Sequence, residues 1–342
     1  MHVISAPDLR RLVTDILAAA GTPPDVAALV AGSLVEANLS GHDSHGVIRV
    51  AQYIEGIRDG EVLPAARPAV VARFGATAQV DAGWGWGPPA ALLAADTAVD
   101  LARQFGVAAV TVQRCNHIGR VGLYTGRIAE AGMAGIALAN VRAWVAPYGG
   151  RERMMGTNPL SWAVPRAPGQ PPLVLDFATS VLAEGKVRVA RDKGVPIPPG
   201  VVVDKDGRPT QTPDDLYGGG ALLPFGEYKG YGISVMIELL GGILSGLGPS
   251  ALPGFSHGNG TLMLALNIPV FAPLDQFIEQ TEAYAARLKA SQPSEGSGGV
   301  LLPGEPEQLS QAQRLAEGIP LPDQTWATLE ATAHSLGVEV TE

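Results

Sequence analysis

Apolar residues in the first sixty positions recur at helical spacing. One stripe is formed by Leu9, Leu12, Val13, Ile16 and Leu17. Ser5 followed by Asp8 resembles a capping box that starts this helix. Pro23-Pro24-Asp25 opens a second predicted helix through about Asn38, and a third ends at Gly60. The pattern therefore predicts an N-terminal helical lobe over residues 1–70.

From residue 71 onwards, short apolar runs alternate with helical segments. The predicted strands cover 74–81, 107–112, 135–141, 173–177 and 261–270. The predicted helices cover 88–105, 121–131, 229–244 and 275–290. Such alternation is typical of an α/β fold, although it does not give the strand order. We expect this α/β lobe to span 71–306, with closing helices within 307–342 packed on the helical lobe.

Composition and charge narrow the class of protein. With 46% hydrophobic residues among 342, the chain can bury a sizeable core. A formal net charge of −9 without any Lys/Arg block argues against a nucleic-acid partner. The single cysteine, Cys115, indicates a reducing cytoplasm and reads as a small buried hydrophobe. No signal-peptide pattern or bilayer-length apolar run is present, so we expect a cytoplasmic protein without a membrane partner.

The most informative polar segment is His42-Asp43-Ser44-His45-Gly46-Val47-Ile48-Arg49. If residues 45–57 are helical, His45 and Arg49 lie one turn apart on the same face. An imidazole exchanges a proton near neutral pH and a guanidinium grips a carboxylate, which a reductase of 2-keto acids needs. A solvated helix start capped by Asp43 explains the same residues about equally well.

Three further polar clusters lie later in the chain. Asn116-His117-Ile118-Gly119-Arg120 comes after 107–112, where ligands bind in α/β sheets, although a capped helix start with a surface His is the alternative. Gly156-Thr157-Asn158-Pro159-Leu160 is a rigid polar turn that reads as structural on its own. Asp176-Phe177-Ala178-Thr179-Ser180 could bind a ribose or cap the next helix.

One helix start has the chemistry of a phosphate site, and several standard motifs are missing. Phe225 to Gly232 places glycines, an aromatic residue and Lys229 at a helix N-terminus, which favours a phosphate, although a flexible glycine-rich start is as good an explanation. The sequence has neither a G-x-G-x-x-G after a strand nor a P-loop, which disfavours both nucleotide-binding classes. His42 and His45 alone are too few for a metal site, so we expect no metal.

Taken together, these segments closely resemble the malate/L-lactate dehydrogenase family of the non-Rossmann, sulfolactate dehydrogenase-like type. The matching stretches span nearly the whole chain: 42–49, 116–122, 156–159, 174–180, 223–232 and 302–305. The resemblance implies reduction of 2-keto acids or related cyclic imines with NADH or NADPH. It also implies a mixed sheet beside the helical lobe, a nucleotide-binding and substrate lobe over 71–306, and a homodimer.

The same resemblance assigns roles to residues. It implies that His45 is the proton donor to the substrate carbonyl and that Ser44 is its hydrogen-bonded partner. Arg49 would hold the substrate carboxylate, and His117 and Thr157 would line the pocket. The dinucleotide would lie against Asp176, Ala178, Thr179, Ser180, Tyr228, Lys229, Gly304 and Glu305.

Several readings stay open at this point. The family majority favours a small, malate- or lactate-like 2-hydroxy acid as substrate. A cyclic imine (piperideine- or pyrroline-2-carboxylate) reductase is the alternative, because no residue separates ketone from imine reduction. A binding protein without turnover and a metal-dependent hydrolase using His42, Asp43 and His45 are further possibilities. The tryptophan-rich loop Gly83–Gly87 departs from the more polar turn of relatives and bears on the substrate. Neither the exact acid nor the choice between NAD and NADP follows from the sequence.

Overall fold

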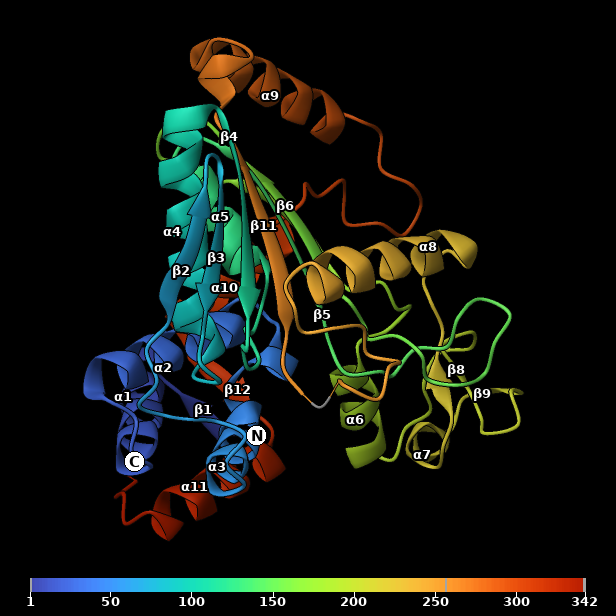
Figure 1. Cartoon of the computed structure of the whole chain (residues 1–342). Helices are drawn as coiled ribbons and strands as arrows, with labels where there is room; N and C mark the ends of the chain where they lie inside the picture. The colour runs from blue at the N-terminus through green and yellow to red at the C-terminus, as the bar shows by residue number, and fades with distance from the viewer. Residues whose placement is uncertain (1, 256, 341–342) are drawn as a thin grey trace.

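The N-terminal elements follow their apolar pattern in the computed structural model, which describes residues 2–255 and 257–340. α1 (Ala6–Ala19) begins after Ser5, whose Oγ accepts a hydrogen bond from Asp8 N at 3.2 Å. α2 (Pro24–Leu39) and α3 (Val50–Arg58) follow. β1 (His2–Ile4), β12 (Ile319–Leu321) and α11 (Asp323–Ser335) join the same core, so both ends of the chain close one lobe (Figure 1). The lobe boundary at residue 70 stays a prediction.

A seven-stranded sheet runs through the second lobe in the order β2-β3-β4-β11-β5-β6-β7. Its strands are β2 (Ala69–Phe74), β3 (Thr77–Asp81), β4 (Val107–Gln113), β5 (Ala134–Asn140), β6 (Leu160–Val164), β7 (Leu173–Phe177) and β11 (Gly260–Leu266). β3 and β4 are parallel, whereas β11 runs antiparallel between β4 and β5. The expected α/β class with a mixed sheet is therefore confirmed.

Helices cover both faces of this sheet (Figure 1). α4 (Gly87–Phe105) and α5 (Gly122–Glu130) pack on one face, where the alanines of α4 allow close approach to buried side chains such as Val110 and Met263. α8 (Tyr228–Ile237) and a π-helical turn, Glu238–Ile243, pack on the other face. Within the part of the chain that the structure describes, no helix is long and apolar enough to cross a bilayer.

The remaining elements lie at the periphery. They are α6 (Glu184–Asp192), α7 (Pro213–Tyr217), β8 (Val202–Val203), β9 (Pro209–Thr210), β10 (Ala221–Leu222), α9 (Leu274–Lys289) and α10 (Glu305–Glu317). β10, β8 and β9 form a small sheet that shares a core with α6 and α7. The sequence pattern predicted neither this unit nor β6.

Three predicted elements differ in the structure. The expected strand 74–81 is half of a hairpin, because Gly75, at φ +52°, turns the chain between β2 and β3. The expected strand 261–270 ends at Leu266, and Pro269 lies in a short 3-10 helix because it has no N–H for a ladder. The expected helix 229–244 changes from α to π geometry at Glu238.

The topology gathers the predicted site loops at one edge of the sheet. β4, β5 and β7 point in the same direction, because the strand between each pair is antiparallel to both. The loops after Gln113, Asn140 and Phe177 therefore leave the sheet at the same edge, and the turn before β6 lies there as well. This edge faces the helical lobe (Figure 1), which is the side where α/β sheets bind ligands.

Candidate active site

The segment from His42 to Arg49 folds as two 3-10 turns, Asp43–His45 and Val47–Arg49, ahead of α3. Gly46 separates them, and a Cβ at this position would lie 2.1 Å from Asn38 Oδ1 of α2. The same oxygen accepts a hydrogen bond from Val47 N at 2.9 Å. The condition of a continuous helix over 45–57 is therefore not met, because Asn38 occupies the space beside Gly46 and the α-helix begins only at Val50.

Ser44, His45 and Arg49 are nevertheless held together. Arg49 Nε donates to Ser44 O at 2.7 Å, and Ser44 Oγ lies 3.2 Å from His45 Nδ1. Arg49 Nη1 donates to Gln52 Oε1 at 2.8 Å, while Nη2 has no hydrogen-bond partner among the described residues. One guanidinium nitrogen of Arg49 therefore has N–H groups that could donate hydrogen bonds to a carboxylate beside the imidazole.

A second imidazole, from the loop after β4, lies against the first. The rings of His45 and His117 are stacked, with centroids 5.5 Å apart and planes 17° apart. His117 Nδ1 lies 2.7 Å from the hydroxyl of Tyr53, which is buried in α3. Sequence reasoning missed Tyr53, although its position four residues after Arg49 on a helix was a usable signal.

Both imidazoles favour the neutral form. Burial is the main cause that lowers the pKa of His45 to about 3, followed by the positive charges of Arg49, His42 and Arg120. Burial also holds the pKa of His117 well below its usual range, and Arg49 and His45 act in the same direction. A substrate carboxylate on Arg49 would cancel part of this positive field and raise the pKa of His45.

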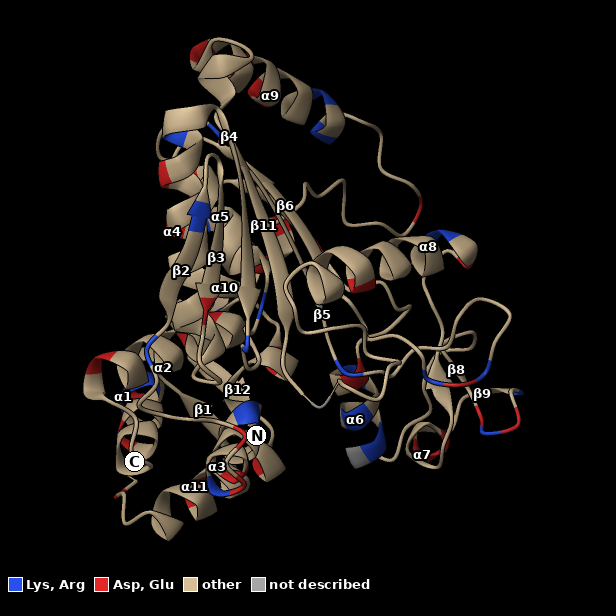
Figure 2. Cartoon of the chain, in the orientation of Figure 1, with Lys and Arg blue, Asp and Glu red and all other residues tan. Residues whose placement is uncertain are grey.

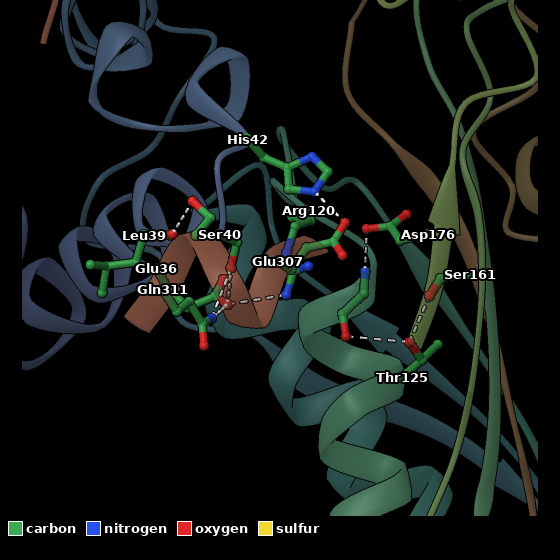
Figure 3. A network of polar contacts seen from close by, with 12 residues as sticks. Glu36, Leu39, Ser40, His42, Arg120, Thr125, Ser161, Asp176, Glu307 and Gln311 are labelled. Carbon is green, nitrogen blue, oxygen red and sulfur yellow. Dashed lines mark hydrogen bonds and ion pairs between the residues drawn. The ribbon is translucent and has the colours of Figure 1, made fainter. Parts of the chain in front are cut away.

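His42 and Asp43 are engaged by α10 rather than by His45. His42 Nε2 lies 3.0 Å from Glu307 Oε1 (Figure 3), and Arg314 Nη1 lies 2.6 Å from Asp43 Oδ1. These contacts fix the N-terminal half of the segment to the C-terminal part of the chain. They favour scaffolding roles for the two residues.

The loop that carries His117 ends in a second ionic contact. Arg120 Nη2 donates to Glu36 Oε1 of α2 at 3.1 Å, and its side chain is only 11% exposed (Figure 3). Asp176, expected at the cofactor, accepts a hydrogen bond through Oδ2 from Gly122 N at 2.7 Å and so caps α5. Burial raises the pKa of this Asp176 carboxyl.

The structure brings Thr157 together with the end of β7. Thr157 O accepts hydrogen bonds from Thr179 N at 2.8 Å and from Thr179 Oγ1 at 3.1 Å. Thr179 O accepts in turn from Phe225 N at 3.0 Å, and Ser180 Oγ donates to Leu182 O at 2.8 Å. The turn before β6, the segment with Ala178 and the turn before α8 therefore form one wall.

The other expected cofactor residues lie farther out. Tyr228 and Lys229 are exposed at the start of α8, with Lys229 Nζ 6.0 Å from the centroid of the Tyr228 ring. Gly304, at φ +91°, approaches the backbone of Val174 in β7, where a Cβ would lie 3.2 Å from Val174 N. Glu305 accepts from Leu302 N at 2.8 Å and pairs with Lys289.

Comparison with known proteins decides the family. The profile of the malate/L-lactate dehydrogenase family matches residues 4–330. The chain belongs to the malate/L-lactate dehydrogenase family. It is 38% identical to an L-lactate dehydrogenase of Cupriavidus necator, over 98% of this chain and 99% of that protein. It is 34% identical to a Δ1-pyrroline-2-carboxylate/Δ1-piperideine-2-carboxylate reductase of Pseudomonas syringae pv. tomato, over 93% and 92%.

A solved structure agrees. The sulfolactate dehydrogenase of Methanocaldococcus jannaschii superposes with a TM-score of 0.89 at 31% identity, covering 99% of this chain and 98% of that one. The resemblance drawn from the motifs and the sulfolactate dehydrogenase-like fold are thereby confirmed. As a malate/L-lactate dehydrogenase family member, the protein is an oxidoreductase of the hydroxy-acid dehydrogenase type, and the family implies a nicotinamide cofactor.

The expected cofactor segments of this family member have groups suited to a dinucleotide. α8 begins without a capping side chain, and although Lys229 N and Gly230 N already donate to Gly226 O and Phe225 O, Tyr228 N has no hydrogen-bond partner among the described residues and is available to a phosphate or ribose oxygen. Lys229 adds a cation at the start of α8. The segments therefore fit the group that the family implies.

An unexpected wall of the site comes from α6. A Cβ on Gly185 would lie 2.4 Å from Ser44 Cβ, so the first turn of α6 packs against the segment that carries Ser44 and His45. Buried Glu184 pairs with Arg188 at 3.0 Å and accepts a hydrogen bond from Tyr217 at 2.9 Å. Basic residues gather on this helix (Figure 2), and the negative charge of Glu184 opposes the burial that lowers the pKa of Arg49. In the described ranges, no three His, Cys, Asp or Glu side chains gather as a metal site would need.

Proposed function

We propose that this protein is an NAD(P)-dependent 2-hydroxyacid dehydrogenase that interconverts a small, malate- or lactate-like 2-hydroxy acid and its 2-keto acid. The observation that carries the proposal is the joined unit of Ser44, His45 and Arg49, with hydrogen-bonding distances of 2.7 and 3.2 Å. A 2-keto acid presents a carboxylate next to a carbonyl. The unit offers a guanidinium next to an imidazole.

Arg49 holds the substrate in this proposal. Its guanidinium stays protonated and offers donors in a planar fork that suits a carboxylate. Anchoring the carboxylate fixes which face of the carbonyl is open to attack, and fixed geometry of this kind contributes strongly to rate. His117 and Thr157 line the pocket, and the Tyr53 hydroxyl orients the ring of His117.

His45 moves the proton. The nicotinamide cofactor, when bound, supplies or accepts the hydride. Once the substrate carboxylate on Arg49 has raised its pKa, His45 takes up a proton from solvent, and the protonated ring passes this proton to the carbonyl oxygen as negative charge develops there, with a contribution of roughly 10²–10⁴-fold. Ser44 Oγ beside Nδ1 orients the ring. In the oxidative direction the neutral ring is the base, and a pKa of about 3 favours this form in the free protein.

The cofactor assignment extends over the outer wall. We assign dinucleotide contacts to Asp176, Ala178, Thr179, Ser180, Tyr228, Lys229, Gly304 and Glu305. Thr179 and Ser180 contact the dinucleotide mainly through van der Waals packing and backbone groups, because their hydroxyls already donate to carbonyl oxygens. Both NADH and NADPH are consistent with this wall.

A homodimer in the cytoplasm completes the proposal. Met236, Ile243 and Leu244 on α8 and the turn after it are 50%, 52% and 56% exposed. An exposed apolar row of this kind supports a covering partner, and a second copy is the partner proposed here.

The experiment is a substrate panel. Purified protein with NADH or NADPH is mixed with pyruvate-like and oxaloacetate-like 2-keto acids, and the loss of reduced-nicotinamide absorbance is followed. Oxidation with at least one keto acid is expected. If neither cofactor is oxidised with any of them, the proposal is wrong.

A cyclic imine reductase is the second candidate. It is supported by the relatedness to the Pseudomonas syringae reductase, at 34% identity. Adding piperideine-2-carboxylate and pyrroline-2-carboxylate to the same panel separates the two. A preference for the imines over every keto acid would select this alternative.

A further inference from the structure

A buried carboxylate outside the described site occupies an unusual place in the chain. Glu238 begins the π-helical turn that follows α8 and is 6% exposed. Burial of a carboxyl group is costly unless donors surround it. A single π-helical turn within a helix is rare and is often found at functional sites.

Donors from three separate segments surround this carboxylate. Oε1 accepts from Gly156 N at 3.1 Å, from Asn158 Nδ2 at 2.9 Å and from Ser250 Oγ at 2.7 Å. Oε2 accepts from Asn140 Nδ2 at 3.0 Å and from Ser250 N at 2.9 Å. Both oxygens are therefore fully used within the protein, which excludes a role in binding ligand directly.

Two of the donors flank Thr157. Gly156 and Asn158 are its neighbours in the chain, and both donate to Oε1. Asn158 has a positive φ of 33°, a conformation that needs support from its surroundings. Its Oδ1 accepts from Val141 N at 3.1 Å, and its Nδ2 also reaches Ser234 Oγ at 2.9 Å. Hydrogen bonds to Glu238 therefore hold the turn on both sides of Thr157, the residue assigned to the substrate pocket.

Helix α8 connects these hydrogen bonds of Glu238 to the residues assigned to the cofactor. Tyr228 and Lys229 begin α8, and Glu238 follows its last residue. At about 1.5 Å per residue, the two ends lie roughly 15 Å apart along a rigid element. On its other side, Thr157 is bonded to Thr179. The position of Thr157 is therefore set by α8 on one side and by the end of β7 on the other.

We propose that Glu238 is a positioning residue that fixes Thr157 against the substrate by holding Gly156 and Asn158. This inference rests on the proposed function, in which Thr157 contacts the 2-keto acid. It assigns a substrate-binding consequence to a group that does not touch the substrate. Loss of the hydrogen bonds from Gly156 and Asn158 to Glu238 weakens substrate binding and leaves the distant start of α8 unaffected.

The primary experiment compares Glu238→Gln with wild type on the best keto acid of the panel. The amide turns two donor hydrogens towards existing donors, so the turn must shift. KM for the keto acid is expected to rise about tenfold, equivalent to about 1.4 kcal/mol. The dissociation constant for NADH, from fluorescence titration, is expected to stay within twofold.

Ser250→Ala is the matched control. It removes one donor to the same carboxylate oxygen but leaves the contacts to Gly156 and Asn158 in place. Its KM should stay within about twofold of wild type, because this hydrogen bond does not hold the turn that carries Thr157. A tenfold rise in this control would mean that any damage to the cluster has the same effect, which contradicts the proposal.

A double-mutant cycle with Thr157→Val separates positioning from general stability. If Glu238 acts through Thr157, the double variant has nearly the same KM as Thr157→Val alone. Multiplied effects, or a Glu238→Gln protein with lower melting temperature but unchanged KM, would overturn the inference. If Glu238→Gln does not fold, Asn158→Gly, which keeps the positive φ, is expected to give the same rise in KM.

The experiments distinguish a failure of the inference about Glu238 from a failure of the proposed function. A wild-type protein that reduces a keto acid while the cycle shows independent effects refutes only the role of Glu238. A wild-type protein without turnover on any keto acid or imine refutes both.

Discussion

Two polar clusters meet at the same edge of the central sheet, and they differ in how completely they are satisfied. Around Glu238 both carboxylate oxygens accept hydrogen bonds from the protein, five in all. Around His45 the guanidinium of Arg49 has one nitrogen without a partner among the described residues, and two neutral imidazoles are stacked face to face. A cluster whose hydrogen-bonding groups are all paired within the protein indicates a structural role. A cluster with an unpaired donor, as around His45, indicates a place for a ligand.

The difference also separates what each cluster can do. A saturated carboxylate can only hold its donors in place, which serves geometry. An imidazole whose pKa is lowered to about 3 by burial and by Arg49 can respond to a bound anion, because a carboxylate on Arg49 opposes one cause of the shift. Substitutions in the two clusters should therefore damage different properties of the protein: stability and the KM for substrate around Glu238, and turnover around His45.

The largest effect on stability is expected from Glu238→Leu. Removal of the carboxylate takes an acceptor from five donors, and two of them, Gly156 N and Ser250 N, have no other acceptor among the described residues, at about 1–3 kcal/mol each before relaxation. We expect the free energy of unfolding, from urea denaturation, to fall by about 2–4 kcal/mol. A loss below about 1 kcal/mol would show that the cluster is not the saturated scaffold described here.

Arg49→Met should damage turnover while leaving the fold nearly intact. Loss of a charged hydrogen bond to the substrate carboxylate costs roughly 1.5–3 kcal/mol, so kcat/KM for the keto acid should fall roughly 10- to 100-fold. Arg49→Lys, which keeps the charge without the planar fork, should lie between the two. Unchanged steady-state kinetics in the methionine variant would remove Arg49 from the site.

The pH dependence of hydroxy-acid oxidation reports on the effect of burial and of the Arg49 charge on the pKa of His45. In the proposed mechanism, hydroxy-acid oxidation needs neutral His45, so kcat/KM is expected to fall only as the pH drops through the pKa of this group. Because that pKa is lowered to about 3, the acid limb should lie well below the ordinary value of about 6.5. In Arg49→Met the limb should move upward, since one cause of the lowering is gone. An acid limb near pH 6.5 in the wild type would contradict the electrostatic description.

The smallest effect is expected from Tyr53→Phe. The variant removes the hydroxyl 2.7 Å from His117 Nδ1 and leaves the buried ring in place. A single lost hydrogen bond of roughly 0.5–1.5 kcal/mol predicts a fall in kcat/KM of about two- to tenfold. Tyr148→Phe is the control, because Tyr148 is exposed and its hydroxyl is 3.5 Å from Glu227. Equal losses in both variants would argue against a specific role for Tyr53.

The two clusters also differ in how far the sequence reveals them. His45 and Arg49 could be predicted because rare residue types with distinctive chemistry stand close together in the chain. Their local geometry could not, since the break at Gly46 is caused by Asn38 of α2. Tyr53 was accessible through its helical spacing from Arg49 but was overlooked.

Glu238 had no comparable signal. It stands alone in a long apolar stretch, and its meaning depends on Gly156, Asn158, Asn140 and Ser250, which approach only in the folded chain. Likewise, α6 could not be predicted as a wall of the site, because its contact with Ser44 joins segments about 140 residues apart. The strand pattern predicted most of the large sheet, whereas its order, with β11 between β4 and β5, came from tertiary pairing.

The central claim is that His45 transfers the proton at a site where Arg49 holds the substrate. Its most direct test is a single-turnover experiment in which NADH-loaded wild type and NADH-loaded His45→Ala are mixed with saturating keto acid while nicotinamide absorbance is followed. We predict that the variant binds NADH normally and oxidises it roughly 10²–10⁴-fold more slowly. Oxidation at the wild-type rate by His45→Ala would contradict the account.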